Sequence, residues 1–208
     1  MSGPEPSTAF PPVVAIASRN PGKIREILAI CGDWPVEWRT ARENPDRWPG
    51  VDETGATYVE NARLKARAVA EALGVAALAD DSGIEVDALG GAPGPRSARF
   101  AGEHATDEEN LRKLIELVRA TPPAGRGARY RCLAVLARPD GTEAFAEGRC
   151  EGTLIDDPRG TGGFGYDPIF VPAGGDETMA ELDPGAKHRI SHRGRALRSL
   201  RAQLLRPA

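Results

Sequence analysis

A long helix that runs directly into a short apolar strand narrows the possible folds more than any other segment of the chain. Thr57 and Glu60 form a capping box, alanines fill the middle of the segment, and Gly74 ends it. The sequence therefore predicts a helix over residues 57–73, followed at once by a buried strand over residues 75–79. A helix and a buried strand in succession are typical of a sheet covered by helices.

The segments on either side predict a mixed sheet. An apolar run at residues 13–17 leads through a polar loop into a predicted helix at 23–30. Residues 129–137 and 142–154 flank a turn of Pro, Asp and Gly, and this pattern predicts an antiparallel hairpin. Further helices are predicted at 106–118 and 191–205. Because helices alternate with strands early and a hairpin follows, we expect an α/β fold with a mixed sheet.

The composition limits the partners that the chain can have. With 208 residues it can bury the core of one domain, and its net charge of -3 argues against a nucleic-acid-binding surface, which needs clustered Lys and Arg. No apolar run is long enough to cross a bilayer. The three cysteines lack a C-x-x-C spacing, so neither a disulfide framework nor a zinc site is indicated, and we expect a cytoplasmic protein. Residues 1–12 are predicted to be a disordered lead, and residues 13–208 one domain.

The loop after the first strand is the first of four candidate functional segments. Residues 18–23, Ser-Arg-Asn-Pro-Gly-Lys, lie where a predicted strand is followed by a helix. The N–H groups and the dipole of a helix start attract anions such as phosphate. Lys23 can add a positive charge there, and Asn20 can orient a phosphate or a sugar through its amide. An ordinary strand-to-helix turn with a surface lysine is the alternative.

Two adjacent carboxylates, Asp80 and Asp81, form the second segment, at the end of a predicted buried strand. Such carboxylates repel each other and lose hydration, so a bound cation such as Mg²⁺ is the simplest explanation. Asp52, Glu53 and Glu60 can complete an acidic cluster if the helix at 57–73 packs beside that strand end. A turn whose side chains cap their own backbone, or a solvated acidic face, is the alternative.

A glycine-rich loop at residues 160–168 is the third segment. Phe164 and Tyr166, separated by Gly165, offer a flat apolar surface for a nucleotide base. Asp167 can accept hydrogen bonds from the edge of that base. The alternative is a flexible loop whose aromatic rings pack onto the core.

The fourth segment, residues 187–194, is rich in hydrogen-bond donors. Lys187, His192 and Arg193 can bind purine oxygen, ring nitrogen or phosphate, and Ser191 can cap the following helix. A basic start of a helix is the alternative, although positive charge there opposes the helix dipole.

Together these segments resemble one family over residues 13–204. The motifs occur in the order Ser18-Arg19-Asn20-Pro21-Gly22-Lys23, Glu53-Thr54-Gly55, Glu60-Asn61-Ala62, Asp80-Asp81-Ser82-Gly83, Gly90-Gly91-Ala92-Pro93-Gly94, Ser97-Ala98-Arg99, the glycine-rich aromatic loop and Ser191-His192-Arg193-Gly194. The combination, which is far more specific than any single motif, resembles the inosine/xanthosine triphosphate pyrophosphatases, also called dITP/XTP pyrophosphatases.

This resemblance implies an elongated α/β fold in which a mixed sheet and flanking helices form two lobes around a nucleotide cleft, in a homodimer. It implies that residues 18–23 hold the triphosphate, that Asp81 is the general base and is associated with the metal, and that Ser82 touches the substrate. The residues implied to recognise the base and sugar are Phe164, Gly165, Tyr166, Asp167, Lys187, His192 and Arg193. The chain departs from the family at Arg19, where Gly is usual, and this excludes a backbone conformation that only Gly adopts.

These observations lead to a hypothesis of Mg²⁺-dependent hydrolysis. The ion, held by Asp81 with help from Asp52, Glu53 or Asp80, bridges the phosphates while a carboxylate orients or deprotonates the water that attacks the α-phosphorus. Lys23 stabilises charge on the leaving pyrophosphate. The expected substrates are triphosphates of 6-keto purines, because a site that binds a 6-keto group leaves a polar group unpaired against adenine.

Three other functions fit parts of the sequence. A nucleotide sensor without activity needs the phosphate and aromatic loops but not the paired acids. A pyrophosphatase of the Maf type, acting on modified pyrimidine or other nucleotides, shares the metal chemistry. A dinucleotide-binding dehydrogenase is disfavoured, because the loop after Ala17 lacks the G-x-G-x-x-G spacing.

Overall fold

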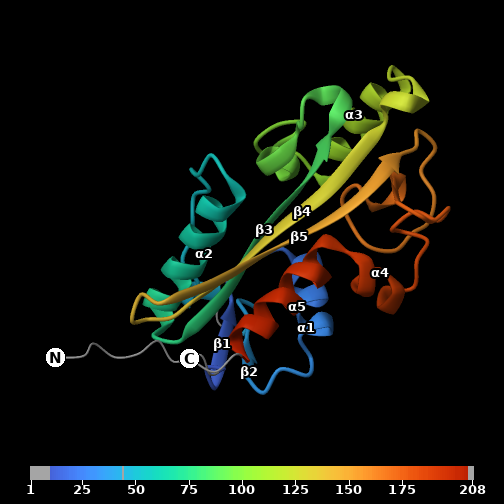
Figure 1. Cartoon of the computed structure of the whole chain (residues 1–208). Helices are drawn as coiled ribbons and strands as arrows, with labels where there is room; N and C mark the ends of the chain where they lie inside the picture. The colour runs from blue at the N-terminus through green and yellow to red at the C-terminus, as the bar shows by residue number, and fades with distance from the viewer. Residues whose placement is uncertain (1–9, 44, 206–208) are drawn as a thin grey trace. The chain divides into compact units, whose positions relative to one another are not determined.

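The computed structural model describes residues 10–43 and 45–205, so most of the predicted lead at residues 1–12 lies outside the described residues. Along the described chain the helices and strands (Figure 1) are β1 (Val13–Ile16), α1 (Pro21–Ile30), β2 (Glu37–Arg39), α2 (Tyr58–Leu73), β3 (Ala76–Val86), α3 (Asp107–Arg119), β4 (Gly127–Ala137), β5 (Glu143–Leu154), β6 (Phe170–Pro172), α4 (Pro184–Ile190) and α5 (His192–Leu204). A 3₁₀ helix, η3 (Gly94–Arg99), precedes α3. Within the described ranges, no helix combines the length and the apolar character needed to cross a membrane.

The strands form one six-stranded sheet in the order β2-β1-β3-β4-β5-β6. β1 pairs in parallel with β2 and with β3, whereas β5 and β6 are antiparallel. The predicted α/β class with a mixed sheet is therefore confirmed. The predicted hairpin is confirmed too, because β4 and β5 are neighbours whose connection is closed by the Arg138 N–H donating to the Thr142 carbonyl oxygen at 2.9 Å.

The chain divides into two compact units, each made of several stretches. As far as it is described, unit 1 comprises residues 10–81, 133–148 and 193–205, and unit 2 comprises residues 82–132 and 149–192. The boundaries fall inside β3, inside β4, inside β5 and within the first residues of α5. The sequence shows no linker because none of these boundaries lies in a loop.

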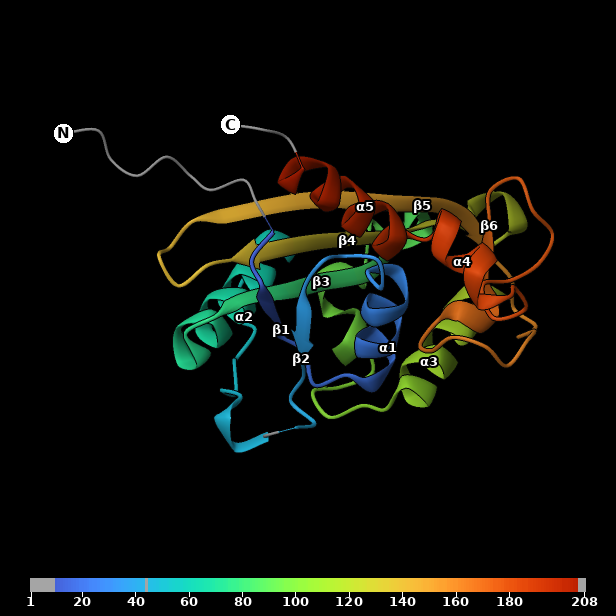
Figure 2. The same cartoon turned by 90° about the horizontal axis from the view of Figure 1, so that it is seen from below.

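Unit 1 has helices on both faces of its strands. In the two views of Figures 1 and 2, α2 lies on one face while α1 and α5 lie on the other. Small side chains dominate the face under α2, which lets the helix approach the strands closely. This cluster contains Ala15, Ala17, Ala62, Ala66, Val69, Ala70, Ala77, Ala79, Val135 and Ala137.

Unit 2 has one apolar and one charged face on its strands. Leu114 and Val118 of α3 belong to its core, together with alternate strand residues such as Ile84 and Tyr130. The residues between them carry charge: Arg129 pairs with Asp87 at 2.5 Å and with Glu151 at 3.1 Å, and Arg131 pairs with Glu85 at 3.0 Å. Side chains alternate between the two faces of a strand, so this pattern follows directly from the sequence.

Most of the predicted elements are confirmed, but one strand boundary needs correction and one helix was not predicted. The sequence predicts a strand that ends at residue 79, which is wrong, because β3 continues to Val86 and contains Asp80 and Asp81. Both carboxylates have cationic partners in unit 1. Because these cations compensate the buried charge, the strand can continue through Asp80 and Asp81 without a turn that would expose them to water. The pattern also fails to predict α4, although Asp183 caps this helix by accepting from the Ala186 N–H at 3.0 Å.

Candidate active site

The side chain of Asn20 caps the N-terminus of α1. Its Oδ1 atom accepts from the Gly22 N–H at 2.8 Å and from the Lys23 N–H at 3.1 Å, and Pro21 occupies the first helical turn. The Asn20 N–H in turn donates to Ser18 Oγ at 3.2 Å. Ser18 and Asn20 thus shape the turn that presents the positive end of α1.

The two cations of this loop have different partners. The Arg19 Nη2 atom donates to the carbonyl oxygen of Trp48 at 2.7 Å, and the buried Trp48 indole donates to the Ile16 carbonyl oxygen at 3.1 Å. No non-glycine residue of the described chain has a positive φ, so Arg19 stands in this loop without backbone strain. Lys23 Nζ lies 3.4 Å from Asp80 Oδ2, and its side chain keeps 17% exposure. Arg19 therefore braces the loop, whereas Lys23 can still reach a bound anion.

Asp80 and Asp81 point to opposite faces of β3, as neighbouring strand residues must. Asp80 meets Arg193 of α5, and Asp81 meets Lys65 of α2. Both side chains are almost completely buried, at 2% and 4% exposure. The two carboxylates therefore have separate cationic partners, although they are adjacent in the chain.

Asp80 is held as a permanent anion. Arg193 donates to Asp80 Oδ2 from Nη2 at 2.9 Å and from Nε at 3.2 Å, and its Nη1 atom pairs with Glu26 of α1. Burial alone would raise the pKa of Asp80, but Arg193, Lys23 and Lys65 outweigh burial and hold that pKa far below its usual value. Arg193 itself is 1% exposed. The sequence predicts that Arg193 binds the base or sugar. In the structure its guanidinium is part of an ion-pair network of unit 1.

The pKa of Asp81 is shifted in the opposite direction, upward. Lys65 Nζ donates to Asp81 Oδ1 at 3.0 Å and to Glu53 Oε1 at 2.8 Å, and Asn61 Nδ2 lies 3.4 Å from Asp81 Oδ2. Burial raises the pKa of Asp81, Glu53 adds to the rise, and the cations Lys65 and Lys23 offset only part of it. A carboxylate with a raised pKa is suited to accept a proton near neutral pH.

Lys65 is a functional candidate that the sequence analysis does not identify. It follows Asn61 by four residues on α2, so both side chains lie on one helix face, and both reach Asp81. Burial would lower the pKa of Lys65, but Asp81, Glu53 and Asp80 outweigh burial and raise it, so the amine is charged. The helical spacing from Asn61 is the sequence signal that points to Lys65.

Of the other acidic residues predicted to gather here, Glu53 shares the Lys65 amine with Asp81. Glu60 Oε2 accepts from the Ala56 N–H at 2.7 Å and the Thr57 N–H at 3.1 Å, which completes the capping box of α2. Within the part of the chain that the structure describes, the Asp52 side chain has no hydrogen bond or ion pair, and no three His, Cys, Asp or Glu side chains form a group that could hold a metal ion. The converging carboxylates are therefore Glu53 and Asp81, with the Lys65 amine bonded to both.

In unit 2 the glycine-rich loop folds around the carboxylate of Asp167. Its Oδ2 atom accepts from Lys187 Nζ at 2.7 Å and from the Phe164 N–H at 2.9 Å. Lys187 Nζ also lies 5.6 Å from the centre of the Phe164 ring. Gly163 has a φ of +71°, and a Cβ atom there would collide with Asp167 Oδ2. The loop therefore has a defined conformation that depends on a glycine at position 163.

The other predicted residues of unit 2 differ in exposure. Tyr166 is buried and donates from its hydroxyl to the Ser97 carbonyl oxygen at 2.8 Å, and burial raises its pKa. Phe164 is only half-buried, so it is the ring of this loop that is more open to solvent. Ser82 and Gly165 are also half-buried. His192 is buried, and its ring stacks on Tyr130 of β4.

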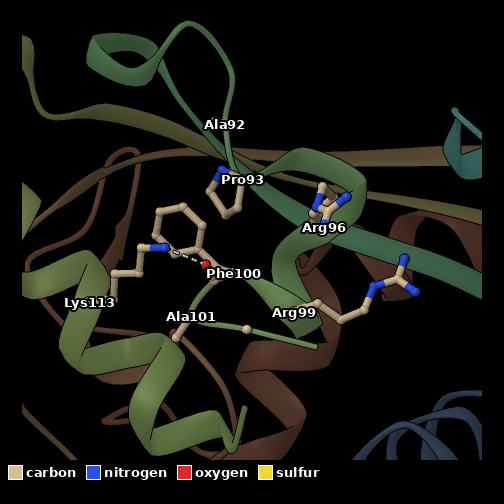
Figure 3. A pocket seen from close by; sticks show the side chains of 8 residues that line it. Ala92, Pro93, Arg96, Arg99, Phe100, Ala101 and Lys113 are labelled. Carbon is tan, nitrogen blue, oxygen red and sulfur yellow. Dashed lines mark hydrogen bonds between the residues drawn. The ribbon is translucent and has the colours of Figure 1, made fainter. Parts of the chain in front are cut away.

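A basic pocket of about 440 Å³ lies in unit 2 next to η3 (Figure 3). Its cations are Arg96, Arg99 and Lys113. Lys113 Nζ donates to the Phe100 carbonyl oxygen at 2.5 Å and lies 4.4 Å from the centre of the Phe100 ring, and Arg99 pairs with Glu103 at 3.4 Å. The pocket shares no lining residue with the predicted site, and two of its three cations already have acceptors.

The sequence of the chain is similar to that of known enzymes along most of its length. A sequence model of the Ham1 family matches residues 14–203. A dITP/XTP pyrophosphatase of Streptomyces coelicolor is 51% identical over 187 residues, which cover 89% of this chain and 93% of the relative. One from Geobacter sulfurreducens is 47% identical over 191 residues, which cover 92% of this chain and 96% of the relative.

Solved structures agree with the sequence comparison. A HAM1 protein from Coxiella burnetii superposes with a TM-score of 0.81 at 40% identity, covering 92% of this chain and 98% of that protein. The Ham1 protein of Staphylococcus aureus superposes with a TM-score of 0.79 at 42% identity, covering 92% and 97%.

Proposed function

The chain belongs to the Ham1 family, and from this premise we propose that it hydrolyses the non-standard purine nucleoside triphosphates ITP, dITP and XTP to the monophosphate and pyrophosphate. The activity named for the Streptomyces and Geobacter relatives supports this assignment. The reaction adds one water across the bond between the α- and β-phosphates, so the enzyme is a hydrolase of phosphoanhydride bonds. Its role would be to remove such nucleotides from the nucleotide pool.

The proposed chemistry depends on the environment of Asp81. This residue is a buried carboxylate with a raised pKa, hydrogen-bonded to Lys65, whereas the adjacent Asp80 is held charged by Arg193. We assign Asp81 as the general base that takes a proton from the attacking water. The oxygen of that water then forms a bond to the α-phosphorus, and pyrophosphate leaves. Lys65, which fixes the Asp81 carboxylate, stabilises the negative charge of the transition state from the same position.

The start of α1 is the proposed phosphate site. The helix dipole favours negative charge there, and Lys23 adds a cation with remaining solvent access. Ser18 and Asn20 keep the turn in shape, and Arg19 fastens it to Trp48. Lys23 would thus stabilise charge on the leaving pyrophosphate, and Ser82 would contact the substrate through its hydroxyl.

A Mg²⁺ ion fits the carboxylates of this site. Glu53 Oε1 and Asp81 Oδ1 converge on the Lys65 amine at 2.8 and 3.0 Å, so two oxygen donors already face one positive charge. Mg²⁺ in nucleotide enzymes is commonly held by one or two carboxylates, with substrate phosphates and water completing its shell. We propose Asp81 and Glu53 as the protein ligands of the ion. Asp52, which directly precedes Glu53 in the chain, is a further candidate ligand. A bound ion would neutralise and align the phosphates.

Unit 2 supplies the groups that we assign to the base and sugar. Phe164 offers the more exposed ring for stacking, and Lys187 and His192 can donate to a 6-keto oxygen or a ring nitrogen. Asp167 orients Lys187 and the backbone of Phe164, and Tyr166 anchors the loop through its hydrogen bond to the Ser97 carbonyl oxygen. Gly165, with a φ of 61°, lets the loop turn between the two rings. Arg193 belongs to unit 1, where it pairs with Asp80 and Glu26. Adenine would present a 6-amino group to the donors Lys187 and His192 and leave a polar group unpaired, which explains the expected selectivity.

The surroundings of the enzyme are also part of the proposal. A homodimer is expected from the resemblance of the sequence, and size-exclusion chromatography with light scattering tests it. The cysteines Cys31, Cys132 and Cys150 are buried and unbridged, which supports a reducing compartment such as the cytoplasm. The partner is a small nucleotide, and the net charge of -3 speaks against nucleic acid.

The deciding experiment measures pyrophosphate release from ITP, XTP, dITP, ATP, GTP, CTP and UTP, with Mg²⁺ and with a chelator. Metal-dependent turnover that favours the first three substrates supports the proposal. If none of the substrates releases pyrophosphate, the proposed hydrolysis is contradicted and the protein is at most a nucleotide-binding protein. A preference for pyrimidine nucleotides would contradict the purine assignment. Equal turnover of ITP and ATP would contradict the selectivity argument.

A further inference from the structure

Tyr130 lies outside every motif of the sequence, yet it contacts two residues that the proposed function assigns to the base. It belongs to β4 and is 6% exposed. Its ring lies parallel to that of His192, with 4.6 Å between centres and 8° between planes. Its hydroxyl donates to Asp167 Oδ1 at 3.3 Å.

The ring of Tyr130 cannot move independently of the core of unit 2. It also packs against Phe170, with ring centres 4.7 Å apart and an interplanar angle of 53°. Tyr130 and Phe170 belong to the same apolar cluster. An imidazole that stacks on a ring held in this way has little freedom to rotate about its χ2 torsion, so the direction of its nitrogen atoms is set by Tyr130.

The hydroxyl of Tyr130 has a similar effect on Asp167. Oδ2 of that carboxylate accepts from Lys187 Nζ at 2.7 Å and from the Phe164 N–H at 2.9 Å, while Oδ1 accepts from Tyr130. Donors on both oxygens fix the plane of the carboxylate, and this plane determines where the Lys187 amine points. A buried network of this kind loses more than one bond when one member is removed.

From these contacts we infer that Tyr130 is a positioning residue for purine selectivity. It orients the His192 ring by stacking and the Asp167–Lys187 pair by hydrogen bonding, so that both present their donors to a 6-keto purine. The inference rests on the proposed function, because it takes His192 and Lys187 as groups that contact the base. Tyr130 itself does not touch the substrate.

Two substitutions separate the two contacts. Tyr130→Phe keeps the ring stack and removes only the hydroxyl, so the ratio of kcat/KM for ITP to that for ATP should fall by about threefold. Tyr130→Leu removes both contacts, and the ratio should fall by about tenfold or more, through a loss of kcat/KM for ITP with that for ATP nearly unchanged. Val118→Ala is the matched control, because it creates a cavity in the same core cluster away from these contacts. It should lower the melting temperature but leave the ratio at the wild-type value.

A spectroscopic measurement tests the geometry without any substrate. The chain has three histidines, so the ring-proton NMR signals of His192 can be assigned by comparison with His192→Gln. The Tyr130 ring current should hold these signals upfield, and they should move downfield in Tyr130→Leu but not in Tyr130→Phe. Unmoved signals, or an ITP-to-ATP ratio for Tyr130→Leu within twofold of wild type, would overturn the inference. Equal turnover of ITP and ATP by the wild-type enzyme would instead overturn the proposed function, and that result is obtained before any variant is made.

Discussion

The candidate residues of unit 1 and those of unit 2 are held in place by different forces. In unit 1 the cations Lys23, Lys65 and Arg193 surround two carboxylates on opposite faces of one strand, and the balance of charge and burial sets the protonation of each carboxylate. In unit 2 a single carboxylate, Asp167, is enclosed by a lysine, two backbone or hydroxyl donors and a group of aromatic rings.

Because of this difference, we expect substitutions in the two units to have different effects on activity and stability. Where the chemistry depends on charge, an isosteric change that removes the charge should abolish turnover or stability. Where it depends on orientation, a change should alter selectivity by degrees. The four predictions below test this division, beginning with the largest expected effect.

Asp81→Asn should reduce kcat by about 10³-fold, the usual contribution of a general base. The fold should survive, because the raised pKa of Asp81 means that its ionised form already lowers stability at neutral pH. The melting temperature should therefore stay the same or rise. Pyrophosphate release and a thermal melt at pH 7 check both parts, and a clear fall in melting temperature would contradict the second.

Asp80→Asn should mainly destabilise the protein, by about 3–5 kcal/mol, because it leaves the buried guanidinium of Arg193 without its full counter-charge. Its neighbour variant Asp81→Asn is the matched control, with the same change of atoms at a similar depth. The pKa of Asp80 is lowered in the fold, so its contribution to stability is present above the ordinary value of 3.8 and is lost as the pH falls below it. The gap in melting temperature between wild type and Asp80→Asn should accordingly be widest at neutral pH and narrow in acid.

Gly163→Ala should destabilise unit 2 by about 1–3 kcal/mol and lower kcat/KM for ITP, because the new methyl group collides with the Asp167 carboxylate and the backbone has a positive φ. Gly174→Ala is the control, since Gly174 also has a positive φ, of +86°, but a methyl group added there would meet no atom within 4 Å. Chemical denaturation of both variants measures the difference. Equal losses would show that backbone strain alone, and not the packing around Asp167, accounts for the effect.

Lys65→Gln should shift the acid limb of the kcat/KM profile upward by about one pH unit. Lys65 lowers the pKa of Asp81, so its removal lets burial and Glu53 raise that pKa further, and the base becomes active only at higher pH. Arg63→Gln on the same helix is the control, because Arg63 pairs with Glu143 and not with Asp81. A limb that stays in place or moves to lower pH would refute the link between Lys65 and Asp81.

Local sequence signals predicted the elements that carry the site. Capping boxes place the starts of α2 and α3, and the Asn-Pro-Gly turn indicates the start of α1. The prediction that the strand ends at residue 79, just before Asp80, was wrong. The rule that adjacent buried carboxylates are unfavourable does not account for cations that come from distant parts of the chain. Arg193 lies 113 residues from Asp80. The residues near Asp80 in the sequence therefore give no signal that Arg193 is its partner.

The amino-acid sequence by itself determined the α/β class, the strand-to-helix turn at residues 18–23 and the set of polar motifs, since these depend on contacts between residues close together in the chain. Only the tertiary structure decided which aspartate has a raised pKa and which has a lowered one. The same is true of Lys65 and Tyr130, which belong to no motif and owe the roles proposed for them to contacts formed by folding. Protonation and side-chain orientation depend on burial and on charges brought together by folding, and a linear pattern of residues does not contain those distances.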